Sequence, residues 1–170
     1  MAHKEISLKF GWLPLRYGVL LLAAAATTGA SRVVFAGADW AAIDFGKQCE
    51  ARSKALWAKP ATGPYAGFAF GRGGGRQGQF YVHLSKPARP GATIVATIGD
   101  QPFLLAGKGE WGWSRNVGQQ SAMIAAVRGG GSMRIDSRDA RGARIVDRYA
   151  LSAAPTAIDA AAAACAGKNG

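Results

Sequence analysis

Short runs of alternating apolar and polar residues, separated by glycine and proline, fill much of this sequence. The clearest run is residues 79–85, in which Phe80, Val82 and Leu84 would share one face of an extended segment. A period of two is typical of β-strands that bury one face. Glycine makes up 24 of 170 residues, about twice its usual share, and favours turns over long helices. The pattern therefore predicts an all-β protein.

The same pattern locates most of the secondary structure. Candidate strands lie at residues 40–45, 48–54, 68–70, 79–85, 93–98, 102–106, 133–138 and 143–151. Two stretches favour short helices, residues 119–128 and the alanine-rich residues 155–165. Short strands punctuated by turns predict one antiparallel sandwich or small barrel over residues 31–170.

The first thirty residues are typical of a secretory signal peptide. Three basic side chains precede an uncharged apolar run at residues 17–26, and small residues follow up to Ala30. We expect cleavage after Ala30, with Ala36 as the alternative, because residues 33–40 resemble the first strand of the exported domain. A retained membrane anchor is disfavoured, since a spanning helix needs about 20 apolar residues. No transmembrane segment is expected after cleavage.

The two cysteines, Cys49 and Cys165, lie near opposite ends of the exported part of the chain. In an oxidising compartment such a lone pair most simply forms a disulfide. Two free thiols are the alternative, and a redox-active pair is disfavoured because its cysteines are usually close in sequence. Two cysteines cannot build a four-thiolate zinc site, and their spacing from the two histidines does not fit a mixed one. We therefore expect a structural disulfide and no metal.

The chain is strongly basic, with 21 lysines and arginines against 10 acidic residues and a net charge of +11. Six arginines concentrate in 21 residues: Arg128, Arg134, Arg138, Arg141, Arg144 and Arg148. In the predicted hairpin, Arg134 and Arg138 would share a face of one strand, and the other strand would present its own pair, Arg144 and Arg148. Such a ribbon could meet phosphate, lipid headgroups or anionic glycan. An ordinary solvated face is the alternative interpretation.

Trp111 and Trp113 alternate within a glycine-rich stretch. Tryptophans in loops can stack on sugars or anchor a partner. Two tryptophans on the same side of a strand can equally be core residues, and the sequence leaves both interpretations open. Together with the four hairpin arginines, these two residues are the candidate ligand contacts.

Signals for catalysis are weak. After export the only histidine would be His83, on the strand face opposite the apolar residues, where a structural role is expected. The glycine-arginine segment 71–78 lacks the lysine and the following helix of a phosphate-binding loop, so we interpret it as a hairpin connection. The carboxylates are scattered and favour solvated ion pairs. We therefore expect no catalytic residues and no cofactor.

Several segments together resemble the invasion-associated locus B family of exported bacterial proteins. The residues that carry the resemblance are 40–43, Cys49, 103–105, Trp111 or Trp113, 122–128, 136–142, 147–151, 157–160 and Cys165. The resemblance spans residues 35–165 and implies an immunoglobulin-like β-sandwich exported to the periplasm or cell envelope. It also implies cysteines at positions 49 and 165. It supplies no catalytic residues, and its link to host-cell invasion is not a mechanism.

These observations predict an exported, non-enzymatic envelope protein. Its expected role is that of a binding or structural module that contacts an unknown protein or an anionic component of the envelope or host. A membrane surface is compatible with this role, whereas export argues against nucleic acid as the partner. The alternative is an exported hydrolase that acts on an envelope polymer through its carboxylates.

Overall fold

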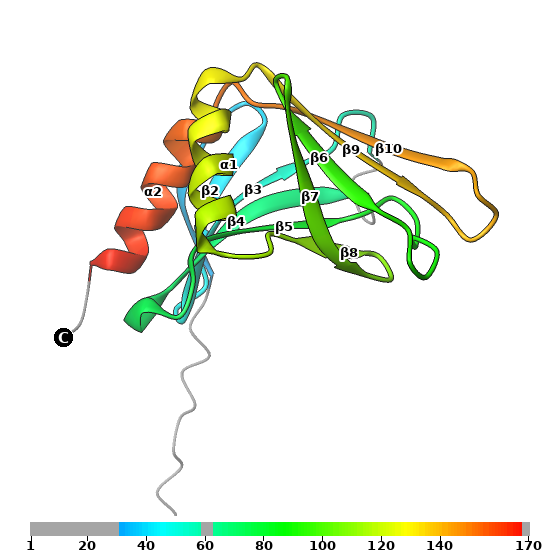
Figure 1. Ribbon diagram of the computed structural model, residues 1–170. Coiled ribbons are helices and arrows are strands. Elements are labelled where there is room, and N and C mark those ends of the chain that lie inside the picture. Colours follow the sequence, from blue (N-terminus) through cyan, green and yellow to red (C-terminus); the bar gives the residue numbers. More distant parts are fainter. Residues whose placement is uncertain (1–30, 59–62, 168–170) are drawn as a thin grey trace, which may run out of the picture.

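A computed structural model describes residues 31–58 and 63–167 as a curved antiparallel sheet with two helices packed on it (Figure 1). The strands are β1 (Arg32–Ala36), β2 (Trp40–Asp44), β3 (Gln48–Lys54), β4 (Tyr65–Gly71), β5 (Gln77–His83), β6 (Ile94–Ile98), β7 (Gln101–Lys108), β8 (Trp111–Trp113), β9 (Ser132–Arg138) and β10 (Arg144–Ala150). The helices are α1 (Val117–Gly129) and α2 (Ala154–Ala166), and a 3-10 turn, η1 (Arg72–Gly74), lies between β4 and β5.

Most neighbouring strands are joined by hairpins, because the described strands follow the order β1-β2-β3-β4-β5-β8-β7-β6-β9-β10. The sheet curls until its two ends approach each other. The indole Nε1 of Trp40 in β2 donates to the carbonyl of Ala150 in β10 at 2.8 Å, and the Leu56 amide donates to the Arg148 carbonyl at 2.7 Å. The expected all-β, sandwich-like fold with two short helices is confirmed.

The core lies between the concave face of the sheet and the helices. Strand residues such as Phe68, Phe80 and Val82 are fully buried there, as are Met123 of α1 and Ile158 of α2. Each such side chain contributes roughly 1.5–3 kcal/mol of hydrophobic stabilisation. The intervening strand positions point to the opposite, outer face, where both candidate binding regions lie.

Each helix was predicted within two residues of its observed bounds at both ends. Two side chains cap the start of helix α1: Asn116 accepts from the backbone amide of Gln119 at 2.9 Å, and the Gln119 side chain accepts from the backbone amide of Arg115 at 2.7 Å. Helix α2 has proline in its first turn, where no intrahelical donor is needed. Among the described residues, no helix has the length and apolar character needed to cross a membrane.

Several strand bounds differ from the predicted ones: β4 and β7 are longer than residues 68–70 and 102–106, and two other segments differ in position. Residues 33–40 are not one strand, because β1 ends at Ala36 and the Gly37 amide closes a turn onto the Trp40 carbonyl, where β2 begins. Strand β5 covers Gln77–His83 rather than residues 79–85, since it starts earlier through a register shift opposite β4. The predicted leader, residues 1–30, lies outside the described residues.

Candidate functional site

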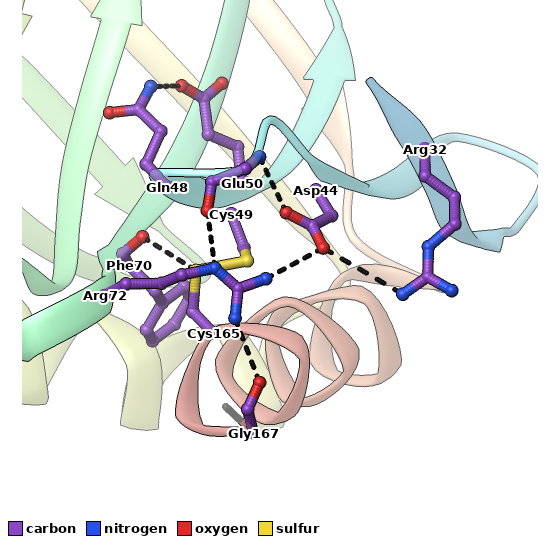
Figure 2. The surroundings of a disulfide bond; sticks show 10 residues. Arg32, Asp44, Gln48, Cys49, Glu50, Phe70, Arg72, Cys165 and Gly167 are labelled. Atoms are coloured by element: carbon purple, nitrogen blue, oxygen red, sulfur yellow. Dashed lines mark hydrogen bonds and ion pairs between the residues drawn. A yellow bond between two sulfur atoms is a disulfide. The ribbon is translucent and has the colours of Figure 1, made fainter. Parts of the chain in front are cut away.

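The disulfide joins Cys49 of β3 to Cys165 of α2, as the sequence predicted (Figure 2). The two Cα atoms are 5.7 Å apart, and 116 positions separate the cysteines in sequence. The bond attaches the last helix to the concave face of the sheet. In the chain-entropy description, closing a loop of this length stabilises the fold by about 4–5 kcal/mol.

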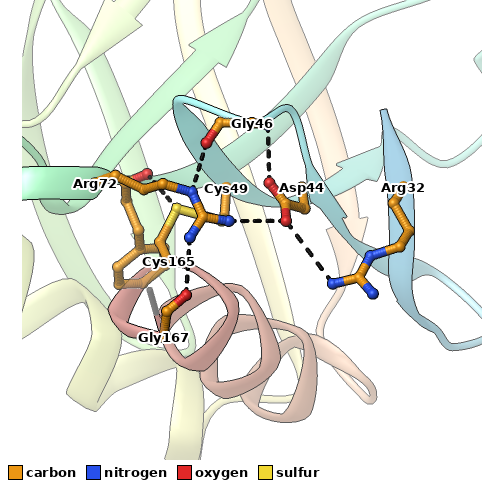
Figure 3. Close-up of polar contacts among 8 residues, drawn as sticks. Arg32, Asp44, Gly46, Cys49, Arg72, Cys165 and Gly167 are labelled. Carbon is orange, nitrogen blue, oxygen red and sulfur yellow. Dashed lines mark hydrogen bonds and ion pairs between the residues drawn. A yellow bond between two sulfur atoms is a disulfide. The ribbon is translucent and has the colours of Figure 1, made fainter. Parts of the chain in front are cut away.

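Arg72 of η1 reinforces the region around the disulfide (Figure 3). Its Nη2 donates to Asp44 Oδ2 at 2.9 Å, its Nη1 donates to the Gly167 carbonyl at 2.9 Å, and its Nε donates to the Gly46 carbonyl. The Gly46 amide and the Arg72 guanidinium lower the pKa of the Asp44 carboxyl. The glycine-arginine segment therefore makes a hairpin connection that holds three parts of the chain together.

The four hairpin arginines share one face of the sheet. Arg138 lies opposite Arg144 in the β9–β10 register, and Arg134 lies opposite Arg148. All four side chains belong to exposed residues on the outer face, whereas Ile135 between them is buried. We call Arg134, Arg138, Arg144 and Arg148 the arginine face.

One aspartate lies within this face. Asp136 accepts from Arg134 Nε at 2.6 Å and from Arg144 Nη2 at 3.1 Å. Arg138 donates to the Gly142 carbonyl at 2.9 Å. Four arginines against one aspartate leave a positive surface, and the arginine side chains that pair with Asp136 are about half exposed or more. Arg128 does not belong to it, because it pairs with Asp159 across α1 and α2.

The two candidate tryptophans lie elsewhere on the outer face, in β8. Strands β7 and β6 separate them from β9, which is a distance of about 14 Å at ordinary strand spacing. Trp111 and Trp113 line a groove of about 350 Å³. We call this the aromatic groove, and its lining residues are Glu50, Arg52, Tyr65, Ala69, Arg76, Gln79, Tyr81, Trp111 and Trp113.

Glu50 is the centre of the hydrogen bonds in the aromatic groove. This glutamate is only 5% exposed although it lies on the outer face. Its Oε2 accepts from the Tyr81 hydroxyl at 2.5 Å and from Arg52 Nη2 at 2.5 Å, and its Oε1 accepts from Gln48 Nε2 at 2.6 Å. Burial, and to a lesser extent the negative charge of Glu50, raises the pKa of the Tyr81 hydroxyl well above its ordinary value. Tyr81 is therefore a neutral donor rather than a base.

A glycine allows Tyr81 to reach Glu50. Gly67 lies opposite Tyr81 in the β4–β5 register, and a Cβ at this position would come within 2.6 Å of both the Tyr81 hydroxyl and the Ala51 carbonyl. The tyrosine ring can cross the sheet only because no side chain stands there. Arg52 lies over the Tyr65 ring, with its guanidinium carbon 4.7 Å from the ring centroid.

His83 lies at one end of this cluster, on the outer face as its strand phase predicted. Its ring stacks on Tyr65 at 5.3 Å between centroids and meets the Trp111 ring edge-on at 4.8 Å. Its Nε2 lies 3.3 Å from Glu110 Oε2, and its buried Nδ1 has no hydrogen-bond partner among the described residues. His83 thus packs within an aromatic cluster beside one exposed carboxylate.

The sequence pattern identified Trp111 and Trp113 but did not predict the groove that they share with Glu50, Arg52 and Tyr81. Its side chains come from β3, β4, β5 and β8 and meet only through strand pairing. The available signal was the alternation within each strand, because Glu50 and Tyr81 both occupy positions that alternate with apolar residues. In the described residues, no group of three histidine, cysteine or acidic side chains could hold a metal ion.

Comparison with known proteins adds no relative: no family model, no curated protein and no solved structure matches the chain. The resemblance to the invasion-associated locus B family, carried by segments such as 136–142 and by Cys49, stays a prediction. The fold defines an all-β, disulfide-linked domain with two polar regions on one sheet face. Both candidate regions are therefore argued from the chemistry of their own side chains.

Proposed function

We propose that the chain is an exported, non-enzymatic binding module of the invasion-associated locus B type that works in the periplasm or cell envelope. Its arginine face contacts an anionic component of the envelope or of a host surface. One observation carries the proposal: the β9–β10 register places four arginines on one face with a single aspartate among them. Guanidinium groups in that arrangement suit phosphate, sulfate or carboxylate groups.

An exposed apolar residue beside β10 supports contact with a surface. Trp57 is 97% exposed and has a left-handed φ of 68°, which is rare for a residue with a side chain. It follows Leu56, whose amide is bonded to the Arg148 carbonyl, so it lies next to the strand that carries Arg148. Tryptophan beside basic residues is common where proteins meet the headgroup layer of a membrane.

The hydrolase alternative has weaker support. His83 contacts one carboxylate, Glu110, and that contact lies among packed aromatic rings. Glu50, the buried carboxylate nearby, has both oxygens occupied by protein donors. A general acid–base pair needs a carboxylate or imidazole free to meet substrate or water. Glu50 lacks that freedom in the described structure, and His83 is packed between the rings of Tyr65 and Trp111.

Salt-dependent retention on heparin and on lipopolysaccharide tests the arginine face. The variant Arg134→Ala/Arg148→Ala should elute at clearly lower salt, because each lost phosphate or sulfate contact reduces counterion release. The matched control Lys86→Ala/Arg115→Ala removes the same charge from exposed positions outside the hairpin. Equal elution of the two variants would mean that only net charge matters and would contradict the proposal.

Export is tested by the N-terminal sequence of the protein recovered from the periplasmic fraction. We expect the chain to begin at Ser31, after cleavage at Ala30. A start at Gly37 would support the alternative site and would remove the whole of β1. A protein that keeps Met1, or that stays in the cytoplasm, would contradict export.

A further inference from the structure

The aromatic groove offers a surface for a flat, partly apolar ring. Trp111 is 40% exposed and Trp113 is half-buried, and both border the open groove beside Tyr65 and Tyr81. Its volume of about 350 Å³ is at the lower end of the range for small-molecule sites, roughly 300–1,000 Å³. The groove therefore suits one or two small rings rather than a large cofactor.

The polar atoms that remain available in the groove are mostly donors. Glu50, its only carboxylate, already accepts from Gln48, Arg52 and Tyr81. Within the described residues, neither Arg52 Nη1 nor the side-chain amide of Gln79 makes a hydrogen bond to protein. Arg76 uses Nη1 toward Gln48 and keeps its other donors. A matching ligand must therefore be rich in acceptors.

The charge of the groove favours an anionic ligand. Arg52 and Arg76 face one glutamate among the lining residues, so one positive charge is in excess. This excess disfavours a quaternary ammonium ion, although the aromatic rings alone would suit one. It favours a carboxylate, which a guanidinium can bind through two parallel hydrogen bonds.

The Arg52 side chain is also pre-organised for such a ligand. Its Nε bonds to Glu50 and to the Tyr81 hydroxyl, and its guanidinium lies over the Tyr65 ring. Its side chain is nevertheless 34% exposed. Little side-chain freedom is left to lose on binding, and pre-organised contacts cost less when the ligand arrives.

We propose that the aromatic groove binds an acidic saccharide through one uronic-acid ring. The C–H face of the sugar stacks on Trp111, its carboxylate meets Arg52, and its hydroxyl oxygens accept from Gln79 and Arg76. This site is independent of the arginine face and of the function proposed for it.

Calorimetric titration with two probes tests the proposal. An unsulfated tri-galacturonate should bind the full oxidised chain, and the neutral galactose trisaccharide of the same linkage should bind at least about tenfold more weakly. Trp111→Ala should weaken tri-galacturonate binding about tenfold or more, the loss expected when a stacking ring is removed. Trp57→Ala, which removes an exposed tryptophan outside the groove, should not change it.

Two more variants separate this site from a general effect. Arg52→Lys keeps the positive charge but lacks the planar guanidinium that can form two parallel hydrogen bonds. The preference for the acidic over the neutral trisaccharide should therefore fall. Thermal melting should show that the variant still folds. Arg134→Ala/Arg148→Ala should bind tri-galacturonate as the parent does. Absence of binding, equal affinity for the neutral trisaccharide, or equal losses in the two tryptophan variants would overturn the proposal.

Discussion

The arginine face and the aromatic groove lie on the same outer surface of one sheet, yet they hold their charges differently. In the arginine face, Arg134 and Arg144 of one hairpin share a single partner, Asp136, whose side chain is 25% exposed. In the groove, which side chains from four strands line, donors from β3 and β5 converge on Glu50, which is buried. The side chains of the arginine face can adjust to partners of different shape, whereas those of the aromatic groove are held in one geometry. The arginine face therefore suits electrostatic contact with a surface, and the aromatic groove suits a ligand ring of defined shape.

The largest difference in the free energy of unfolding between the two regions should come from replacing their acidic residues. Glu50→Ala should lower the free energy of unfolding by about 2–3 kcal/mol, because three donor residues, one of them Arg52 with its partly buried guanidinium, lose their acceptor. Asp136→Ala removes the equivalent carboxylate from the exposed arginine face and should change it by less than about 0.5 kcal/mol. Urea unfolding of the two variants gives the comparison, and similar losses would show that the groove is no more rigid than the hairpin.

A second test concerns the space under Tyr81. Gly67→Ala would place a methyl group 2.6 Å from a backbone carbonyl and from the tyrosine hydroxyl, and should cost about 2 kcal/mol. Gly75→Ala is a fair control, since it has open space around its Cβ and an ordinary right-handed helical φ of −67°. Thermal or urea unfolding measures both. A neutral Gly67→Ala would mean that Tyr81 does not need to lie across the sheet.

The same substitution at half-buried Tyr81 and at buried Tyr149 should change the free energy of unfolding differently. Tyr81→Phe removes a donor to Glu50 and should cost about 1 kcal/mol. Tyr149 lies on the core side of β10, beneath the arginine face, and its buried hydroxyl has no partner among the described residues. Tyr149→Phe should therefore be neutral or stabilising. A loss at Tyr149 equal to that at Tyr81 would reveal a partner for its hydroxyl.

How far each region could be predicted depends on the sequence distance between its parts. The arginine face is local, so alternation in residues 133–138 and 143–151 sufficed to place each strand's pair on one face. The register that unites the two pairs followed from the turn at residues 139–142, where the Gly142 amide bonds to the Asp139 carbonyl. Local patterns therefore carried the prediction.

The aromatic groove could not be derived in this way. Glu50 and Tyr81 meet because β4 separates β3 from β5 and because position 67 lacks a side chain. Trp111 joins them only because β8 pairs with β5 rather than with β6, which no local pattern reveals. Strand phase identified the outward positions, but the strand order decided which of them became neighbours.

Replacing the exposed arginines should change the free energy of unfolding least. Arg134→Ala and Arg148→Ala should each change the free energy of unfolding by less than about 0.5 kcal/mol, because exposed charges contribute little to stability. Chemical unfolding measures this change. A loss above 1 kcal/mol would mean that the arginine face is needed for the fold, and would remove the contrast with the groove.

The Cys49–Cys165 bond has a consequence for how the protein responds to a protease. Its cysteines are 116 positions apart in sequence, so both candidate regions lie within one covalent ring. A protease that cuts once in a loop such as residues 86–92 opens the ring but releases neither piece. The nicked molecule keeps its mass, apart from an added water, until a reductant separates the fragments. Gel electrophoresis with and without reductant would then distinguish intact protein from protein that has been cut but still holds together.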